Sequence, residues 1–253
     1  EKDKIWEILN LIEYDFGLIC TPNSLHLEHV LLLCEAGIPF FCEKPLYVND
    51  KDNRLQKIQN LIEEKELINM IGCNLRFHPA IKKITPKSLE NVISIDVRFG
   101  YDLKKWHNDG KHLESYSANR SLGGGITFDC IHEFDYLYHW AGQIEDINLI
   151  QEKLTQVTVD TEDLVHGNIK FKNGLVANIK LDYIEPEYTR YYILNFKDGR
   201  KETVSIDPAE GNQYNDQLDY FINNVRKNNS CMNNFEEANY LIKKIHSGIE
   251  VFI

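Results

Sequence analysis

The sequence predicts an α/β protein, in which part of a doubly wound, parallel Rossmann-type sheet precedes an α+β domain with a mostly antiparallel sheet. In the first 76 residues, short apolar runs alternate with amphipathic helical segments, as in repeated strand–helix units. After Arg76 the pattern changes to strands with alternating apolar and polar residues. The dipeptides Asn173-Gly174 and Asp198-Gly199 join such strands as tight hairpin turns. We therefore expect two domains, residues 1–76 and residues 77–253.

The parallel part is expected to contain three buried strands connected by helices. Each strand is a compact apolar run that ends in polar residues or a turn signal. The helix after the first strand should end at Gly37, which suits a left-handed C-cap. The next helix should begin at Asn49 or Asp50 and extend to about Lys65. The other expected elements are a helix end at 4–13, strands at 16–20, 38–42 and 67–73, and a helix at 24–36.

The second part should be built mainly of strands. A strand at 91–100 alternates apolar and polar residues, which indicates one buried face. A polar and aromatic segment at 102–122 is expected to be a long functional loop. The other expected elements are a short helix after His78-Pro79, a loop and helix at 123–140, strands at 145–153, 163–172, 174–184 and 190–197, and helices near 212–227 and 235–250.

The composition excludes several classes of partner. The chain has 28 Lys and Arg residues against 39 Asp and Glu residues, a net charge of −11, so we expect neither nucleic acid nor an anionic membrane surface as a partner. No apolar run approaches the ~20 residues that span a bilayer. The cysteines form no CxxC pair, so we expect reduced, buried thiols in a cytoplasmic protein and no metal site. They are Cys20, Cys34, Cys42, Cys73, Cys130 and Cys231.

Polar segments follow the three apolar strands of the first part, at Thr21-Pro22-Asn23, Glu43-Lys44-Pro45 and Asn74-Leu75-Arg76. The carboxyl ends of parallel strands share one edge, where such sheets bind ligands. Lys44 is either a solvated lysine or a fixed cation that holds a substrate hydroxyl and favours its alkoxide character. Pro45 restricts the backbone of Lys44 to extended conformations, which helps to aim the side chain.

A second constellation follows the glycine run Gly123-Gly124-Gly125, which allows a sharp turn and a close approach to a ligand. Asp129 and His132 are three residues apart, which on one helix places them on the same face. Histidine titrates near neutral pH and can take a hydroxyl proton, while Asp129 could orient the imidazole or bind a neighbouring hydroxyl. The alternative is an aspartate at a helix start beside a partly buried histidine. The acidic neighbours Glu133 and Asp135 are expected on the helix surface or between domains.

Other polar residues have two interpretations each. Asn23 could cap the following helix, or Thr21, Asn23 and His26 could contact a cofactor at the sheet edge. Arg76 and His78 could bind substrate hydroxyls or an acidic group. The long loop offers Tyr116 as a pocket residue, besides Trp106, His107 and Arg120. For these loop residues a surface or core role is the alternative.

Together these segments resemble the Gfo/Idh/MocA family, which is named after glucose-fructose oxidoreductase and inositol dehydrogenase. The resemblance rests on Ile19-Cys20-Thr21-Pro22-Asn23 with His26, on Glu43-Lys44-Pro45-Leu46, and on Gly123-Gly124-Gly125 leading to Asp129 and His132. It implies a Rossmann domain and an oxidoreductase that uses NAD or NADP on a sugar or polyol. Three segments are similar to members associated with surface-polysaccharide or sialic-acid-like sugars: Arg76-Phe77-His78-Pro79, Ser115-Tyr116-Ser117-Ala118 and Asp129-Cys130-Ile131-His132-Glu133.

The resemblance also implies roles for individual residues. Lys44 and His132 would form the catalytic pair, and Asp129 would assist them. Arg76, Tyr116 and Asp129 would bind substrate. The implied cofactor-binding residues are Thr21, Pro22, Asn23, His26, Glu43, Lys44 and Arg76. The family further implies a homo-oligomer, a dimer or tetramer, formed through the sheet of the second domain.

Two departures from the family pattern keep other functions open. Many members separate the aspartate and histidine by four positions rather than three, which changes their angle on a helix by about 100°. The family's first strand and glycine-rich turn, which hold the pyrophosphate at a helix N-terminus, do not occur in the sequence. We expect the chain to be a piece of a longer protein. The alternatives are an NAD-dependent glycosidase of the same family and a non-catalytic sugar-binding or regulatory protein.

Overall fold

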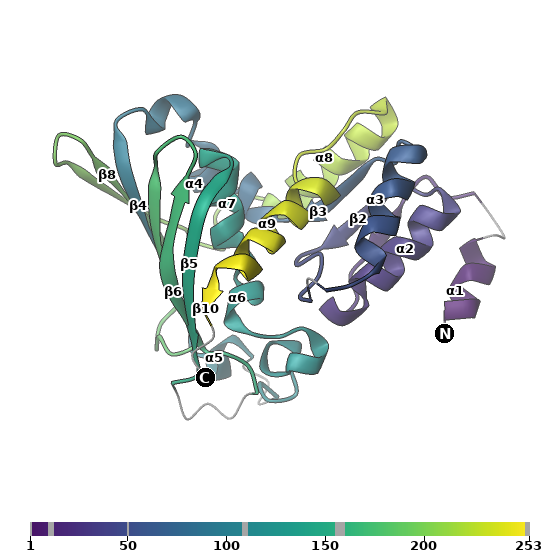
Figure 1. Ribbon diagram of the computed structural model, residues 1–253, viewed down its shortest axis with the longest axis horizontal. Helices are drawn as coiled ribbons and strands as arrows, with labels where there is room; N and C mark the ends of the chain where they lie inside the picture. Colours follow the sequence, from purple (N-terminus) through teal and green to yellow (C-terminus); the bar gives the residue numbers. More distant parts are fainter. Residues whose placement is uncertain (1, 10–12, 50, 108–110, 155–159, 251–253) are drawn as a thin grey trace. The chain divides into compact units, whose positions relative to one another are not determined.

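The computed structural model describes residues 2–9, 13–49, 51–107, 111–154 and 160–250 (Figure 1). The contacts divide the chain into two compact units. The first unit comprises Glu1–Cys73 and Tyr214–Tyr240, and the second comprises Asn74–Gln213 and Leu241–Ile253. The sequence pattern predicts residues 214–240 in the second domain, whereas their contacts place them in the first unit.

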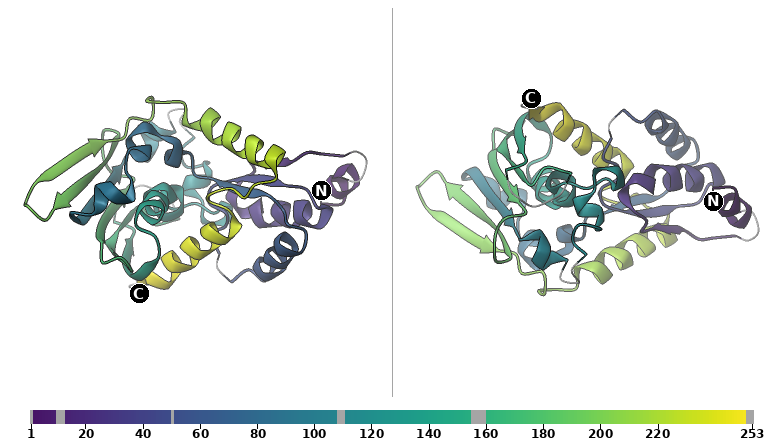
Figure 2. Two further views of the ribbon diagram at one scale, coloured as in Figure 1. Left: turned by 90° about the horizontal axis from the view of Figure 1, so that it is seen from above. Right: turned by 90° about the horizontal axis from the view of Figure 1, so that it is seen from below.

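The first unit contains a three-stranded parallel sheet in the order β1 (Gly17–Ile19), β2 (Phe40–Glu43) and β3 (Asn69–Gly72). Its helices are α1 (Lys2–Leu9), α2 (His26–Ala36), α3 (Arg54–Glu64) and α8 (Gln213–Lys227). Both faces of the sheet are covered, because α2 and α3 lie on one side and α8 on the other (Figure 2). This two-sided burial explains the continuous apolar run of β2. The predicted parallel sheet is confirmed.

The outer edge of β3 is closed by the segment before α9 (Phe235–Gly248). The Ile71 amide donates to the Asn233 carbonyl at 2.7 Å, and the Asn233 side-chain amide donates back to the Ile71 carbonyl at 2.7 Å. The Phe235 amide donates to the side-chain oxygen of Asn69 at 2.6 Å. Asn233 therefore pairs with β3 much as a neighbouring strand would, with a left-handed φ of 52°.

We expect Asn233→Ala to lower the free energy of unfolding by about 2–3 kcal/mol, because the buried Ile71 carbonyl loses a donor. Asn228→Ala is the matched control, because Asn228 also has a φ of 52° but is exposed beyond α8. The difference between the two variants in urea unfolding isolates the side-chain hydrogen bond from the backbone strain. Equal losses in both variants would contradict the proposed edge pairing.

The second unit contains a seven-stranded sheet in the order β10-β5-β6-β7-β4-β8-β9. Neighbouring strands are antiparallel except in the pairs β4–β7 and β5–β10, so the predicted mostly antiparallel sheet is confirmed. The short strand β10 was not expected from the sequence, and for β9 only the preceding Asp198-Gly199 hairpin turn was predicted, without a range. The strands are β4 (Val92–Gly100), β5 (Ile144–Glu152), β6 (Leu164–Phe171), β7 (Val176–Asp182), β8 (Thr189–Phe196), β9 (Lys201–Ser205) and β10 (Ile249–Glu250).

One face of this sheet is apolar and covered by helices. Ile95, Val97 and Phe99 of β4 are buried, while the intervening Asp96 and Arg98 are less so, as the alternating pattern predicts. Helix α6 (Ile126–Asp129) packs on β6 and β7. Helix α7 (Ile131–Ala141) reaches β8, where the rings of Trp140 and Tyr192 meet edge to face at 5.0 Å. The smaller helices are α4 (Pro79–Lys82) and α5 (Leu103–Trp106).

Several predicted boundaries are wrong. Helix α2 begins at His26 after a 3-10 turn over Asn23–Leu25, and the Asn23 side chain does not cap it. Helix α3 begins at Arg54 rather than at Asn49, because residues before Arg54 form a turn in which Asp52 accepts the Arg54 amide. Asp50 lies outside the described residues. The expected loop at 102–122 includes α5 and two 3-10 turns, and its residues 108–110 also lie outside them.

The six cysteines are free thiols. Five are buried as expected, whereas Cys20 is exposed, because β1 ends at Ile19 and Cys20 lies beyond the sheet. Burial raises the pKa of the Cys34 thiol to about 12. Of the helices in the described part of the chain, none is long and apolar enough to cross a membrane.

Candidate active site

Lys44 lies directly after β2, in a turn whose following residues are firmly held. The side chain of Leu46 is fully buried, and the Tyr47 hydroxyl donates to the side chain of Asn239 at 2.7 Å. The Lys44–Pro45 peptide bond is cis. Lys44 itself is half-buried. The cation that the sequence singles out is therefore placed at the carboxyl end of a parallel strand on a fixed stretch of backbone.

The carboxyl group of Glu43 is half-buried beside Lys44. Burial raises its pKa, and the positive charge and backbone amide of Lys44 partly oppose that increase. The native chain therefore holds a proton on Glu43 more strongly than the unfolded chain does. Stability from this group is present below the unfolded pKa and is lost as pH rises through the raised folded pKa.

We expect Glu43→Gln to stabilise the protein relative to wild type increasingly as pH rises from about 4 to about 7, because glutamine has no charge to bury. Denaturant unfolding over that pH range measures the difference. Glu64→Gln is the matched control, since Glu64 is exposed on α3. A pH dependence that is the same for both variants would contradict the assigned burial cost.

His26 joins the turn after β1 to the turn after β2. It is fully buried, with Nδ1 2.6 Å from the Pro45 carbonyl oxygen and Nε2 2.8 Å from the Thr21 carbonyl oxygen. Both ring nitrogens are engaged, so neither is available for the cofactor contact predicted for His26. Burial lowers the pKa of His26, while the two carbonyl contacts raise it.

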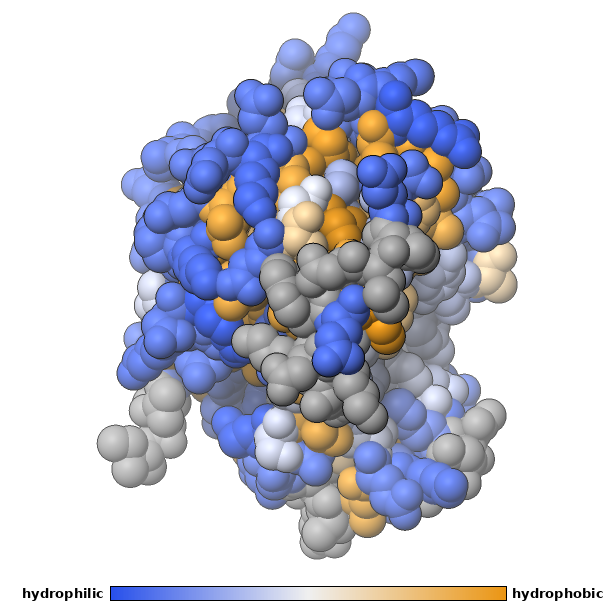
Figure 3. Space-filling view, turned by 90° about the vertical axis from the view of Figure 1, so that its right-hand side faces the viewer, coloured by the Kyte–Doolittle hydropathy of each residue, from blue (hydrophilic) through white to orange (hydrophobic). Residues whose placement is uncertain are grey.

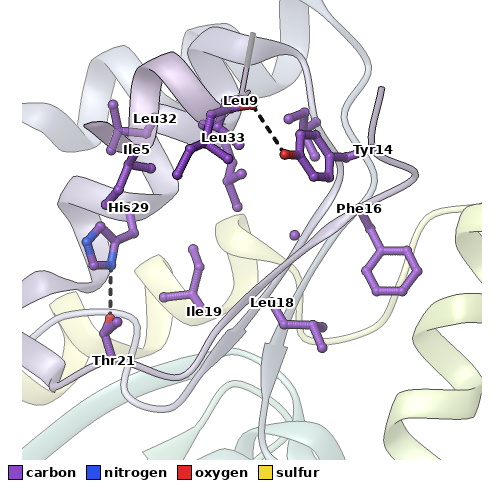
Figure 4. Close-up of a pocket in the computed structure, with 13 residues that line it drawn as sticks. Ile5, Leu9, Tyr14, Phe16, Leu18, Ile19, Thr21, His29, Leu32 and Leu33 are labelled. Carbon is purple, nitrogen blue, oxygen red and sulfur yellow. Dashed lines mark hydrogen bonds between the residues drawn. The ribbon is translucent and has the colours of Figure 1, made fainter. Parts of the chain in front are cut away.

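The Thr21 turn also borders a pocket on the side of β1 away from β2 (Figure 4). The Thr21 hydroxyl lies 3.0 Å from Nδ1 of His29, while Asn23 is buried within the 3-10 turn. The pocket has a volume of about 330 Å³ and is lined mainly by apolar side chains, including Leu18, Ile19 and Leu33. Leu18 is 51% exposed. Figure 3 shows hydrophobic surface between hydrophilic side chains on the side where α1 lies in Figure 1.

Asp129 is held between two tyrosine hydroxyls in the second unit. Tyr116 donates to Oδ1 at 2.8 Å and Tyr183 donates to Oδ2 at 2.9 Å. Asp129 is 2% exposed. Burial and the nearby Asp129 carboxylate raise the pKa of Tyr183, so this hydroxyl stays protonated and donates. Tyr183 follows β7 and was missed in the sequence, where nothing marks it as a partner of Asp129.

The expectation that Asp129 and His132 share one continuous helix is wrong. Helix α6 ends at Asp129, and Cys130, with φ −103° and ψ 35°, separates it from α7, which begins at Ile131. The aspartate therefore ends one helix and His132 lies in the first turn of the next. Asp129 and His132 therefore lie on either side of a break in the helix. The angle between their side chains cannot be calculated from the 100° per residue of a continuous helix.

The glycine run allows the close packing that fixes this region. A side chain at Gly124 would begin 2.1 Å from the Tyr116 carbonyl oxygen, and Gly125 has a φ of 119°. A side chain at Gly125 would also meet the carboxylate of Glu162 at 2.4 Å. The sharp turn predicted from the three glycines therefore brings the Tyr116 turn against the start of α6.

Contrary to the prediction, Glu133 and Asp135 lie neither on the helix surface nor between domains, but form buried ion pairs within the second unit. Arg76 donates from Nε and Nη2 to Asp135, both at 2.8 Å, and the two side chains are 1% and 2% exposed. Arg190 donates to Glu133 at 2.8 Å and lies over the ring of Phe99. The carboxylates are buried because each has an arginine partner. Binding of substrate or cofactor by Arg76 remains a prediction, to which this ion pair gives no support.

His78 also has a structural role. Its Nδ1 accepts from the Ala80 amide at 3.1 Å and so caps α4, while Nε2 lies 2.8 Å from the Asp207 carbonyl oxygen. The side chain is fully buried. With both ring nitrogens engaged, His78 has none left for a substrate hydroxyl.

The donor groups of the first unit fit part of the expected nicotinamide dinucleotide. The half-buried Lys44 ammonium group follows β2, while the Thr21 hydroxyl, which contacts His29, and the buried Asn23 amide follow β1. Such donors suit ribose and phosphate oxygens. The sequence has no G-x-G-x-x-G turn for the pyrophosphate. Lys44 belongs to the first unit, and Asp129 and His132 belong to the second.

Comparison with known proteins supports the resemblance in both units. Residues 3–73 match the sequence model of an oxidoreductase family with an NAD-binding Rossmann fold. Residues 80–200 match the model of the GFO/IDH/MocA C-terminal domain. The levoglucosan dehydrogenase of Pseudarthrobacter phenanthrenivorans is 26% identical over 187 residues, which cover 64% of this chain and 47% of that protein.

A second curated relative is the 2,7-anhydro-N-acetylneuraminate hydratase of Escherichia coli, 25% identical over 202 residues, covering 78% of this chain and 52% of the relative. The chain thus spans about half the length of the curated relatives it matches. The fold is similar to that of myo-inositol 2-dehydrogenase from Lactobacillus plantarum, with a TM-score of 0.76, 15% identity and coverage of 96% of this chain and 80% of that one. The chain belongs to the Gfo/Idh/MocA family of oxidoreductases, and its residues 3–73 match the family's NAD-binding Rossmann domain.

Proposed function

We propose that the protein is an NAD- or NADP-dependent oxidoreductase that transfers a hydride between the nicotinamide and a hydroxyl-bearing carbon of a sugar or polyol. The observation that carries the proposal is Lys44, a cation held at the carboxyl end of β2 by the buried residues that follow it. The related dehydrogenase and hydratase are named for sugar derivatives, levoglucosan and an anhydro-neuraminate, which supports a sugar substrate. A role in surface-polysaccharide sugar metabolism is the narrower form of this proposal.

Each residue has a separate task in the proposed reaction. The bound nicotinamide supplies the hydride acceptor or donor. The Lys44 ammonium group donates a hydrogen bond to the reacting oxygen and stabilises its negative character. His132 takes the hydroxyl proton at Nε2, because its Nδ1 is shielded from solvent. Asp129 positions the hydroxyls of Tyr116 and Tyr183, and so shapes the substrate side of the second unit.

We also propose a cytoplasmic homo-oligomer, a dimer or tetramer, that assembles through the open face of the large sheet. A row of polar side chains crosses this face, where Asp96 accepts from Asn178 at 2.7 Å and from Asn195 at 2.8 Å. Such groups can form hydrogen bonds with a second copy. Light scattering measures the mass in solution, and a monomer at all concentrations would contradict this part of the proposal.

The function is tested with the full-length product of the gene. NAD⁺ and NADP⁺ are each offered with polyols, aldoses, anhydro-sugars and nucleotide-linked sugars, and the absorbance of the reduced nicotinamide is followed. We expect turnover with at least one sugar class and one cofactor. Release of an aglycone without net cofactor reduction would point instead to the glycosidase alternative. Failure to bind either cofactor would contradict the proposed function.

A further inference from the structure

The environment of His26 differs from that of an ordinary buried histidine. Its two ring nitrogens both face backbone carbonyl oxygens, Pro45 at 2.6 Å and Thr21 at 2.8 Å. A carbonyl oxygen can only accept, and a neutral imidazole carries a single N–H. A protonated ring donates to both oxygens, whereas a neutral ring donates to one and turns a lone pair toward the other.

The two carbonyls belong to neighbouring turns of the same sheet. In the β1–β2 register, Ile19 pairs with Cys42, so Thr21 and Pro45 follow paired strand ends. Pro45 is the residue next to Lys44. His26 itself is the first residue of α2, whose next turn is anchored by the fully buried Val30. The imidazole therefore connects the backbone beside Lys44 to the start of a well-packed helix.

The charged groups around the ring set the pH range of this connection. His29, on the same helix, and Lys44, in the turn after β2, both oppose a positive charge on His26. Burial is the largest effect and acts in the same direction, so the pKa of His26 lies below its ordinary value. Two acidic residues lie close to this connection: Glu28 is in the first turn of the same helix as His26, and Glu43, at the end of β2, lies beside Lys44.

We propose that His26 is a positioning residue for Lys44: it ties the Lys44–Pro45 turn to the Thr21 turn through both ring nitrogens, and loss of its proton releases one of the two bonds. The functional consequence rests on the proposed oxidoreductase activity. The connection itself is a property of the first unit and can be measured without turnover.

The first experiment uses the full-length protein labelled with ¹⁵N-histidine and ¹⁵N-lysine. Ring ¹⁵N shifts report whether His26 carries one proton or two, and the signals are assigned with His26→Gln and Lys44→Arg. The titration is made in Glu43→Gln, because the Glu43 carboxyl interacts with the Lys44 amide and would itself move that resonance. We expect the Lys44 amide resonance to shift along the same pH curve as the His26 ring. A Lys44 resonance that does not follow that curve would overturn the proposal, whether or not the protein has activity.

The second experiment compares His26→Gln with the matched variant His29→Gln. Both histidines lie in the first turns of α2, but His29 contacts the Thr21 hydroxyl rather than the Pro45 carbonyl. We expect His26→Gln to displace the Lys44 resonance and lower kcat about 10- to 100-fold, with the KM for cofactor little changed. His29→Gln should leave the Lys44 resonance coupled to the His26 ring and only move their common curve along the pH axis, because His29 opposes a positive charge on His26. Equal effects of both changes would overturn the proposal, and if His26→Gln does not fold, the titration in Glu43→Gln decides alone.

Discussion

Asp135→Asn should lower the free energy of unfolding by about 3–5 kcal/mol, the loss expected when one partner of a buried ion pair is removed. In the wild-type protein the Arg76 guanidinium balances the charge of the Asp135 carboxylate and donates two hydrogen bonds to it, both of 2.8 Å. Neither side chain is more than 2% exposed. Asparagine keeps the shape of aspartate but removes its charge. Its oxygen can still accept one of the two bonds, while its NH2 group places a donor against the other N–H of the guanidinium. Urea unfolding of the variant measures the loss.

An exposed ion pair in the same unit provides the control. Lys170 and Glu145 lie 3.0 Å apart with side chains about half exposed, so Glu145→Gln should cost no more than about 0.5 kcal/mol. The double change Arg76→Met with Asp135→Leu should recover much of the stability lost in Asp135→Asn, because no unpaired charge remains buried. A loss in Asp135→Asn no larger than that in Glu145→Gln would show that this pair is not needed for stability.

The parts of the fold that the sequence predicts depend on local patterns. The strands β2 and β3 are almost entirely buried because both faces of their sheet are covered (Figure 2), whereas β1, at the edge of the sheet, leaves Leu18 51% exposed. The hairpin turns at Asn173-Gly174 and Asp198-Gly199 appear where predicted, because glycine adopts the positive φ that each turn requires. Gly37, with φ 75°, ends α2 for the same reason. In each case the sequence pattern and the strand, turn or helix end that it predicts involve residues within a few positions of one another.

The parts that the sequence could not predict depend on distant partners. Arg76 follows a strand end, which favours a ligand role, yet its partner Asp135 is 59 residues away. Tyr183 is 54 residues from Asp129. Asn233 closes the edge of β3 although it lies 162 residues after Ile71 in the sequence. It is a polar residue between two helices, and nothing in the sequence around it indicates this role. Helical periodicity likewise cannot show a break at a single residue such as Cys130.

We expect His132→Asn to lower kcat by about 10²- to 10⁴-fold, the usual contribution of a general acid or base. Asparagine cannot take the hydroxyl proton, but it leaves the cofactor-binding unit untouched, so NADH affinity measured by fluorescence should be unchanged. His139→Asn is the matched control, because His139 lies two turns later on α7. A small and equal effect of the two changes would contradict the role proposed for His132.

Lys44→Met should lower kcat by a comparable factor, about 10²- to 10³-fold, because methionine fills the space of the aliphatic stem without the ammonium group. Lys57→Met controls for the loss of one positive charge, since Lys57 is exposed on α3 in the same unit. The double variant Lys44→Met with His132→Asn distinguishes a shared step from independent ones. If both residues act on the same oxygen, either single change already abolishes most of their joint effect on the reaction. The fold decrease in kcat of the double variant is then smaller than the product of the fold decreases of the two single variants. A combined loss equal to that product would mean that Lys44 and His132 serve separate steps, and the proposed joint action on one hydroxyl would be wrong.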